Sequence, residues 1–346
     1  MKKSKRVVSI LILLCLVISM TTGCFKTKGK SEKIAIIFSS VGLGDKSYND
    51  LCYEGVLKAQ EELGIEFDYC EPKSSKEYEA VIRKCAENEE YVLIITVDSE
   101  QVDGVEKVSK DFPKQKFITC DSRVTLPNVV SIYEKWTEQV FLNGSIAGLS
   151  MLSGMDKVSK KNVAGVILGI ESSQLREAAV AFEAGVKYVN PNAKVISAVV
   201  NDFSSYSKTK ELSLLLYGKG ASFIQHLAGS AGLGVFAAAN EADKYAFGVD
   251  GNQNLYDPNH IVATARRDID NILFKEIKDM KSGNFNPGVH EYDMKEDVLR
   301  GAREGSNVVL SEEIIQRVEN IKSKIINKKI IIPSTANELE RWEIKK

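Results

Sequence analysis

Histidine and the sequence motifs of metal and nucleotide chemistry are scarce in this chain. Its 346 residues include three histidines, His226, His260 and His290, and none stands at metal-ligand spacing from another. The phosphate-binding patterns G-x-G-x-x-G and G-x-x-x-x-G-K-[S/T] are absent, as is the G-x-S-x-G turn that presents a nucleophilic serine. These absences argue against a metalloenzyme, a phosphate-loop enzyme and a serine hydrolase.

An excess of charge of either sign is also lacking. Lys and Arg number 46 and Asp and Glu number 47, which leaves a formal net charge of −1. Proteins that bind nucleic acids concentrate positive charge, and this sequence does not, so we expect no nucleic-acid partner. Apolar residues make up 44% of the chain and charged residues 27%, which suffices for a sizeable core and a well-solvated surface.

Closely spaced cysteine pairs are missing too. Of the six cysteines, two lie within the first 24 residues, and the other four, Cys52, Cys70, Cys85 and Cys120, contain no C-x-x-C pattern. We interpret these four as mostly buried small apolar residues, and we expect no metal site. Exported proteins can carry disulfides, and the spacing leaves open whether any of the four pair.

The apolar run Val7–Met20 is shorter than the ~20 residues that a membrane-spanning helix needs. Four basic residues precede it and small residues follow it, which is typical of a secretory signal peptide. The small residue Gly23 directly before Cys24 resembles a bacterial lipoprotein signal, which predicts a signal peptide over 1–23 and a lipid attached at Cys24. An ordinary signal peptide, or a short uncleaved anchor with an incidental cysteine, remains the alternative.

The composition changes after the first 33 residues. Residues 24–33 are polar and basic, which predicts a flexible tether. From Ile34 on, short apolar runs alternate with helical stretches. The chain that follows the signal has about 320 residues, enough for two lobes.

Two successive series of buried strands, separated by helices, make up this part of the chain. Continuous apolar strands of this kind are typical of parallel sheets covered on both faces, so we expect an α/β fold with two doubly wound lobes. In such sheets ligands bind at the carboxyl ends of the strands, where this sequence runs into polar or glycine-rich loops. The predicted strands are 34–38, 66–70, 91–96, 116–120 and 129–133, then 162–169, 194–200, 222–228 and 245–250.

The first candidate site is the segment Ser39–Gly55, between the first strand and the first helix. Asp45 and Asn49 place a carboxylate and an amide near the start of that helix. A carboxylate accepts two hydroxyl hydrogen bonds, as the vicinal diol of a ribose offers. A capped helix start without ligand contact explains the same residues.

Later strand ends carry further candidate residues. In Gln225–Val235 a strand runs into a glycine-rich turn, and Gly229 brings backbone N–H groups close to a cleft; a tight strand–helix connection is the alternative. Asp250 also ends a strand, where it is either a turn residue or a cleft residue. Phe203 and Arg266 are smaller signals, and each by itself favours a structural role.

Four segments together resemble one family. They are VGLGDKSYNDLCYEG, FEAGVKYVNPNAKV, HLAGSAGLGV and YAFGVDGNQ. In this order and spacing they are similar to the basic membrane protein family, the lipid-anchored substrate-binding proteins of ABC importers that include purine nucleoside receptor lipoproteins. The similarity runs from about Ile34 to Pro333. It implies a type I periplasmic-binding-protein fold, in which two doubly wound parallel-sheet lobes are joined by a three-crossing hinge.

The resemblance also implies lobe boundaries. Each lobe is built from two stretches of chain, because the chain crosses between the lobes three times. The N-terminal lobe would comprise residues 34–132 and about 252–288, and the C-terminal lobe residues 133–251 and about 289–340.

Contacts to a planar base are implied for three residues, and a hydrogen-bond donor is implied for a fourth. Tyr53 and Phe203 stand where the family has aromatic rings, and together they would sandwich the base. Glu138, at the start of a second-lobe helix, would accept a hydrogen bond from a purine N–H. Arg266 stands where the family usually has Lys, and it would donate through a wider fork.

Polar contacts are implied for five more residues. Asp45 and Asn49 would meet the ligand from the first loop. Gly229 and Ser230 would line the ribose. Asp250 would accept hydrogen bonds from its hydroxyl groups.

The function that follows is that of a binding protein, not an enzyme. It would capture a nucleoside, in particular a purine nucleoside, and deliver it to an ABC permease and its ATPase without a cofactor. The lipid anchor would hold it on the outer face of the cell membrane, as in a Gram-positive bacterium. The alternatives are another planar ligand such as riboflavin, a surface receptor or adhesin on the same fold, and a nucleoside hydrolase. In the hydrolase, Asp45 with Asp250 or Glu138 would form the carboxylate pair.

Overall fold

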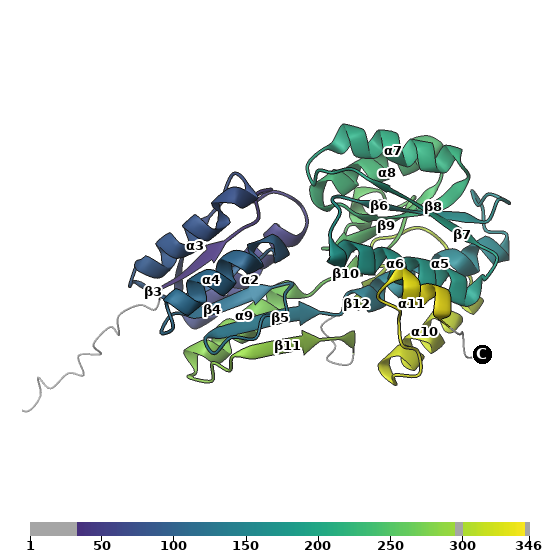
Figure 1. Ribbon diagram of the computed structural model, residues 1–346. Coiled ribbons are helices and arrows are strands. Elements are labelled where there is room, and N and C mark those ends of the chain that lie inside the picture. The colour runs from purple at the N-terminus through teal and green to yellow at the C-terminus, as the bar shows by residue number, and fades with distance from the viewer. Residues whose placement is uncertain (1–32, 295–299, 343–346) are drawn as a thin grey trace, which may run out of the picture. The chain divides into compact units, whose positions relative to one another are not determined.

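The computed structural model describes residues 33–294 and 300–342, which belong to one compact unit built on two six-stranded sheets (Figure 1). The predicted signal peptide and Cys24 lie outside the described residues, as does the tether up to residue 32. Lys33, which the sequence assigns to the tether, is the first residue of the first strand.

The first sheet is entirely parallel and carries helices on both faces. Across the sheet its strands are β11 (Gly288–Tyr292), β5 (Val129–Glu134), β4 (Lys116–Cys120), β3 (Tyr91–Thr96), β1 (Lys33–Ile37) and β2 (Glu66–Cys70). The covering helices are α2 (Tyr48–Leu63) with α9 (Ile269–Lys281) on one face, and α3 (Tyr78–Glu87) with α4 (Val102–Asp111) on the other. This sheet and these helices are the first lobe.

The packing of β1 explains why its sequence is a continuous apolar run. Ile34 and Ile36 point toward α2 and α9, whereas Ala35 and Ile37 point toward α3 and α4, and all four side chains are buried. A strand buried on both faces has no solvent-facing positions, so apolar residues do not alternate with polar ones. The strand leads directly into the first candidate loop.

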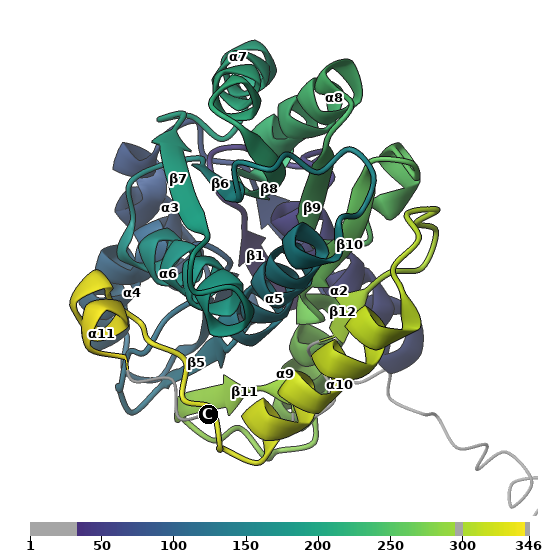
Figure 2. The same ribbon diagram turned by 90° about the vertical axis from the view of Figure 1, so that its right-hand side faces the viewer.

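The second sheet is parallel except at one edge, where β12 (Arg300–Ala302) runs antiparallel to β10 (Ile261–Arg266). The remaining strands, in order, are β9 (Tyr245–Asp250), β8 (Ala221–Leu227), β6 (Val163–Leu168) and β7 (Lys194–Val199). Figure 2 shows α7 (Tyr206–Gly218) and α8 (Leu233–Ala242) on one face, and α5 (Thr137–Ser153) and α6 (Ser173–Val189) on the other. With α10 (Glu312–Ile326) and α11 (Ala336–Arg341), these elements are the second lobe.

Two glycines allow α5 and α6 to cross in direct backbone contact. A Cβ atom on Gly185 would collide with the carbonyl oxygen of Phe141, and one on Gly144 would collide with the carbonyl oxygen of Phe182. Protein interiors are close-packed, so no larger residue fits at either position without moving a helix. This crossing fixes α6, whose first turn borders the ligand pocket described below.

The chain crosses between the lobes after β5, after β10 and after β11. The strand pairing therefore places two lobe boundaries later in the sequence than the predicted positions near residues 252 and 289. The apolar stretch of β10 adds a fifth parallel strand to the second sheet, so the second crossing falls near Arg267. Because β11 pairs with β5, the third crossing falls after Tyr292. The predicted α/β class with two doubly wound parallel sheets is confirmed.

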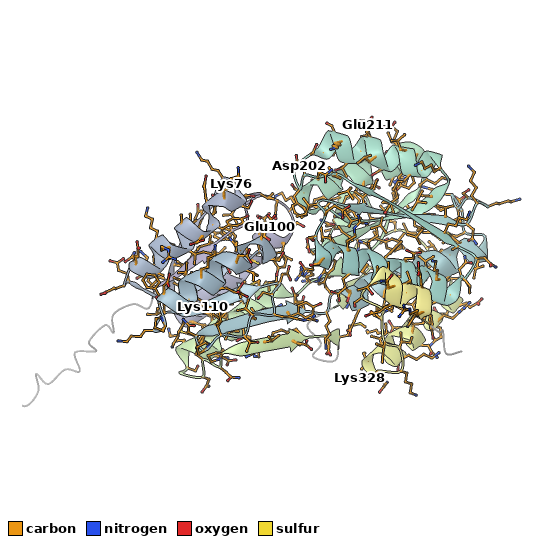
Figure 3. The ribbon with its side chains drawn as sticks, viewed as in Figure 1. Lys76, Glu100, Lys110, Asp202, Glu211 and Lys328 are labelled. Carbon is orange, nitrogen blue, oxygen red and sulfur yellow. The ribbon has the colours of Figure 1, made fainter. Side chains whose placement is uncertain are left out.

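Both lobes carry exposed charged side chains. Figure 3 shows Lys110 of the first lobe and Glu211 of the second lobe extending away from their helices, and both residues are exposed. Among the residues that the structure describes, no helix combines the length and the apolar character needed to cross a membrane.

Candidate ligand-binding site

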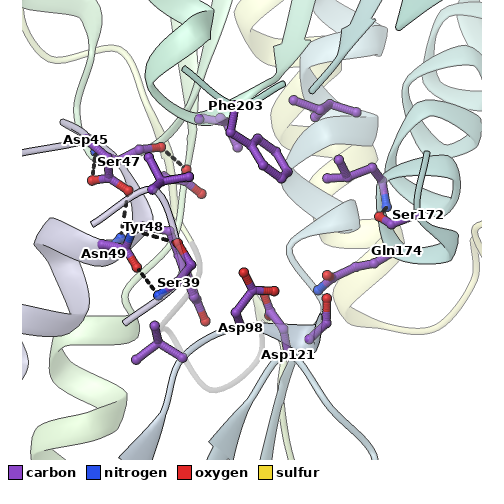
Figure 4. A pocket seen from close by; sticks show the side chains of 18 of the residues that line it. Ser39, Asp45, Ser47, Tyr48, Asn49, Asp98, Asp121, Ser172, Gln174 and Phe203 are labelled. Atoms are coloured by element: carbon purple, nitrogen blue, oxygen red, sulfur yellow. Dashed lines mark hydrogen bonds between the residues drawn. The ribbon is translucent and has the colours of Figure 1, made fainter. Parts of the chain in front are cut away.

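A pocket opens at the carboxyl ends of strands from both sheets, as expected for sheets of this type (Figure 4). The first lobe lines it with the segments that follow β1, β3 and β4, and the second lobe with those that follow β6, β7, β8 and β9. Trp136 and Arg267, at two of the crossings, complete the lining. The empty space among the lining residues is about 790 Å³, and this figure includes space that is open to solvent.

Asp45 both caps a helix and lines the pocket. Its carboxylate accepts hydrogen bonds from the backbone N–H groups of Ser47 (2.9 Å) and Asn49 (3.0 Å), at the start of α2. Burial nevertheless raises the pKa of Asp45 to about 6, because the backbone donors only partly offset the cost of desolvating the charge. The helix-cap and ligand interpretations of this residue are therefore compatible.

The amide of Asn49 holds the first loop in shape. Its Oδ1 accepts from the backbone N–H of Ser39 (3.2 Å), and its Nδ2 donates to Ser39 Oγ (2.8 Å) and to the carbonyl of Gly42 (2.9 Å). Asn49 lines the pocket, but both of its amide protons are already engaged. Its contribution is to the geometry of the wall.

Asp250 ends β9 in a left-handed conformation, with a φ of 68°. Its carboxylate accepts a hydrogen bond from the hydroxyl of Ser47 in the first lobe, and its carbonyl accepts from the N–H of Arg267 (2.9 Å). Burial raises the pKa of Asp250, while nearby Arg267 and the Ser47 bond act in the opposite direction. Because Asp250 also lines the pocket, it places a buried carboxylate where the two lobes meet.

Arg267 is the centre of a buried ion cluster at the floor of the pocket. Its Nε donates to Glu134 (2.8 Å), its Nη1 to Asp121 (3.0 Å), and its Nη2 to the hydroxyl of Tyr48 (3.3 Å). The guanidinium also lies over the rings of Tyr48 (4.2 Å) and Trp136 (5.2 Å). The only cation in the described pocket lining is therefore already shared between two carboxylates.

Glu134 is the most deeply buried member of this cluster. Burial raises its pKa to about 7, although Arg267 acts to lower it. Its second oxygen, Oε1, is buried and has no hydrogen-bond partner within the described structure. The cluster is thus held by Arg267, and removing that residue would leave two acids close together in the protein interior.

Phe203 supplies a half-buried ring to the pocket. Figure 4 shows the ring extending into the space opposite Asp98. The ring packs so closely on Gly169 that a Cβ there would overlap it. The Phe203 carbonyl accepts from Ser230 Oγ (2.9 Å) and from the N–H of Ala231 (2.7 Å), which fixes the loop that carries the ring.

Asp98 and Gln174 line the pocket but were not predicted. Asp98 follows β3 and accepts from the N–H of Glu100 (2.9 Å), and burial raises its pKa to about 6. Gln174, in the first turn of α6, carries a buried Nε2 that has no partner among the described residues. The strand-end rule points to Asp98, since it lies two residues beyond Thr96, but no motif marks Gln174.

Five of the predicted residues line the pocket, and four do not. Those in the lining are Asp45, Asn49, Phe203, Gly229 and Asp250. Among the others, Tyr53 lies one and a half helical turns beyond Tyr48, and its ring packs edge-on against Phe38 and Phe67 in the first-lobe core. The tyrosine that reaches the pocket is Tyr48.

The remaining three predicted residues have structural partners instead. Glu138 accepts from the backbone N–H of Met294 (3.0 Å), and Ser230 donates to the Phe203 carbonyl. Arg266 ends β10 beside Asp268, at 3.5 Å, whereas its neighbour Arg267 faces the pocket. Successive side chains of an extended chain point to opposite sides, so a one-residue error in assignment moves the charge out of the site.

Two α/β lobes with an aromatic and carboxylate-rich pocket at their strand ends form a site suited to a small molecule. The chain belongs to the family of PnrA-like ABC transporter substrate-binding proteins, whose model matches residues 31–336. The resemblance to the basic membrane protein family is thereby confirmed.

Individual relatives are similar to this protein over most of its length. A CD4+ T-cell-stimulating antigen of Listeria monocytogenes is 29% identical over 329 residues, covering 88% of each chain. Basic membrane protein A1 of Borrelia garinii is 27% identical over 338 residues, covering 95% of this chain and 96% of its own. A solute-binding protein of an Aeropyrum pernix ABC transporter has the same fold, with a TM-score of 0.80, 24% identity and coverage of 90% and 96%.

Proposed function

We propose that this protein captures a nucleoside, in particular a purine nucleoside, and delivers it to the permease of an ABC importer. The observation that carries the proposal is the combination of the Phe203 ring with the carboxylates of Asp45, Asp98 and Asp250 around a single pocket. An aromatic face attracts a planar base, and carboxylates accept hydrogen bonds from sugar hydroxyls and base N–H groups.

The charge of the pocket favours a ligand without phosphate. Four aspartates line it, and the guanidinium of Arg267 is already bound by Asp121 and Glu134. A phosphate would bring negative charge next to these carboxylates without a free cation to receive it, which costs several kcal/mol in a partly buried site. A neutral nucleoside meets no such penalty.

The protein would hold its ligand between the two lobes, because the residues proposed to contact the ligand come from both of them. Asp45 and Asp98 belong to the first lobe, and Phe203 and Asp250 to the second. A ligand that touches both sets stabilises the closed arrangement of the lobes relative to an open one. The closed form is the form that a permease and its ATPase would accept. A lipid at Cys24 would keep the protein on the extracytoplasmic face of the membrane, within reach of that permease.

A thermal-shift screen of the full chain tests the proposal. Ligands that bind only the folded state raise its melting temperature by mass action, so purine nucleosides should raise it. Pyrimidine nucleosides, free bases and riboflavin are screened beside them. A response to riboflavin with none to nucleosides would overturn the proposed ligand class. Chromatography of the same mixtures checks for free base, whose appearance would contradict a pure binding role.

A further inference from the structure

Two side-chain amides belong to the described pocket lining, those of Asn49 and Gln174, and they differ in what they bind. The Nδ2 of Asn49 is engaged inside the first loop, where it donates to Ser39 and Gly42. The Nε2 of Gln174 is enclosed by the protein and has no hydrogen-bond partner within the described structure. A donor that is shielded from water without a partner is costly, so we expect its partner to arrive with the ligand.

The start of α6 places Gln174 at the pocket. Ser172 caps this helix, because its hydroxyl oxygen accepts from the backbone N–H of Leu175 (3.2 Å). Gln174 therefore lies in the first turn of the helix, where it borders the space. Figure 4 shows its side chain extending from this turn into the space that Asp98 and Asp121 also line. The position of the amide is thus set by the helix start and not by a hydrogen bond from its Nε2.

The segment that leads into α6 also supports the ring of Phe203. This segment, residues 169–174, follows β6, and the Phe203 ring packs directly on Gly169 at its start. Gln174 stands at its end, and Figure 4 shows the two side chains extending into the same space. A base that stacks on the Phe203 ring therefore turns an edge toward the Gln174 amide.

The carboxylate of Asp98 supplies the second half of a recognition pattern. Asp98 faces the same space as Gln174, and when ionised it only accepts hydrogen bonds (Figure 4). A 6-oxopurine, the base of inosine or guanosine, presents the acceptor O6 beside the donor N1–H, and an amide N–H with a carboxylate matches this pair. Adenine in the same orientation presents an amino group to the amide and an unprotonated ring nitrogen to the carboxylate, so neither contact is made.

We propose that Gln174 makes this site specific for 6-oxopurine nucleosides, by donating a hydrogen bond from Nε2 to the carbonyl oxygen O6 of the base. Asp98 accepts from the adjoining N1–H. The inference rests on the proposed function and deepens it, because it names the class of base that the pocket selects. A site built to pair with a polar group of its ligand rejects an analogue without that group, since its own donor is then left unpaired.

Calorimetric titration of the full chain with inosine and with adenosine tests the inference. The wild type should bind inosine more tightly than adenosine. Gln174→Met keeps the length of the side chain and removes its N–H groups, so its affinity for inosine should fall roughly tenfold, while its affinity for adenosine should change less than about threefold. Gln174→Glu replaces the donor with an oxygen and should weaken inosine binding at least as much. Gln316→Met, at an exposed position of α10, is the matched control and should leave both affinities unchanged.

The outcomes separate this inference from the function on which it rests. Saturable binding of inosine that neither substitution of Gln174 weakens would overturn the inference alone. Equal losses of affinity for inosine and adenosine in Gln174→Met would also overturn it, because they would indicate a purely structural role for the side chain. Tighter binding of adenosine than of inosine by the wild type would do the same. Binding of neither nucleoside by the wild type would overturn the proposed function together with this inference.

Discussion

The hydroxyl of Ser47 donates a hydrogen bond to the carboxylate of Asp250, and this bond joins the first loop of one lobe to a strand end of the other. The two residues are 203 positions apart in the sequence, and both are buried. Asp250 holds a positive φ there, a conformation that Asp adopts more readily than most residues. Since both residues line the pocket, the contact links the packing of the lobes to the ligand site.

Replacing Ser47 with Ala should therefore destabilise the protein. The buried carboxylate of Asp250 would lose its side-chain donor, and the loss of a hydrogen bond to a charged group costs about 1.5–3 kcal/mol. Urea unfolding at pH 7 measures the change. Ser75→Ala, at an exposed position, is the matched control and should stay within about 0.5 kcal/mol of the wild type. Equal effects of the two substitutions would contradict the role of the bond.

The Arg267 cluster predicts a larger effect. Arg267→Met leaves Glu134 and Asp121 without their cation in the interior, and the loss of one partner of a buried pair costs about 3–5 kcal/mol. Arg176→Met removes an exposed cation that pairs with Glu171, and it should cost less than about 1 kcal/mol. Denaturant unfolding of both variants gives the comparison. A small effect at Arg267 would show that the two carboxylates are protonated or solvated without it.

The raised pKa of Asp98, about 6, predicts a dependence of stability on pH. In the unfolded chain this group titrates near its ordinary value of about 3.9, so between about pH 6 and pH 4 the folded state binds its proton more readily. The free energy of unfolding therefore gains a contribution as the pH falls through this window, and loses it as the pH rises.

Asp98→Asn removes this contribution. The wild type should gain stability relative to the variant as the pH is lowered from 7 to 4, as measured by urea unfolding at each pH. Asp103→Asn, at an exposed position of α4, is the control for the loss of one carboxylate. If the difference between wild type and Asp98→Asn is the same at every pH, Asp98 does not titrate as described.

The pocket geometry itself could be predicted from the sequence only in part. Asp250 was located because the carboxyl ends of parallel strands converge on one edge, whereas Phe203 was assigned to the site through the family resemblance. Tyr48 lines the pocket and Tyr53 packs in the core because they lie on different faces of α2. The sequence has a ring at both positions, so it does not reveal which of the two faces the ligand. The choice between Arg266 and Arg267 depends in the same way on where β10 ends.

Other features required the three-dimensional structure. Gln174 lies in the first turn of α6, which packs against α5 where Gly144 faces the carbonyl of Phe182 and Gly185 faces that of Phe141, and no local sequence pattern reports this packing. The strand β10 was not predicted, so the second crossing was placed too early. The alternation of buried strands and helices, by contrast, sufficed for the fold class.

The close crossing of α5 and α6 yields a stability prediction of its own. Gly185→Ala places a methyl group against the carbonyl of Phe141, and such overpacking costs about 1–3 kcal/mol or more. Gly218→Ala, near the end of α7, meets no atom within 4 Å and should be neutral or slightly stabilising. Thermal unfolding of both variants measures the contrast. Equal melting temperatures would mean that the two helices can separate without cost.

The role proposed for Phe203 predicts a loss of affinity without unfolding. Phe203→Ala removes the ring that would stack on the base, and such stacking contributes about 1–3 kcal/mol, so affinity should fall roughly 5- to 150-fold. Tyr53→Phe is the control, because the Tyr53 ring packs in the core and should not influence binding. Fluorescence or calorimetric titration measures both. Unchanged affinity in Phe203→Ala would contradict the stacking role of this ring.

The central claim is that an acidic pocket, with the Phe203 ring on one wall, binds an uncharged nucleoside. Calorimetric titration of the full chain with adenosine, inosine and guanosine, each beside its 5′-monophosphate, tests this claim most directly. We predict saturable binding of at least one nucleoside and a large loss of affinity for the corresponding monophosphate. Equal binding of both forms, or heat from neither, would contradict the account.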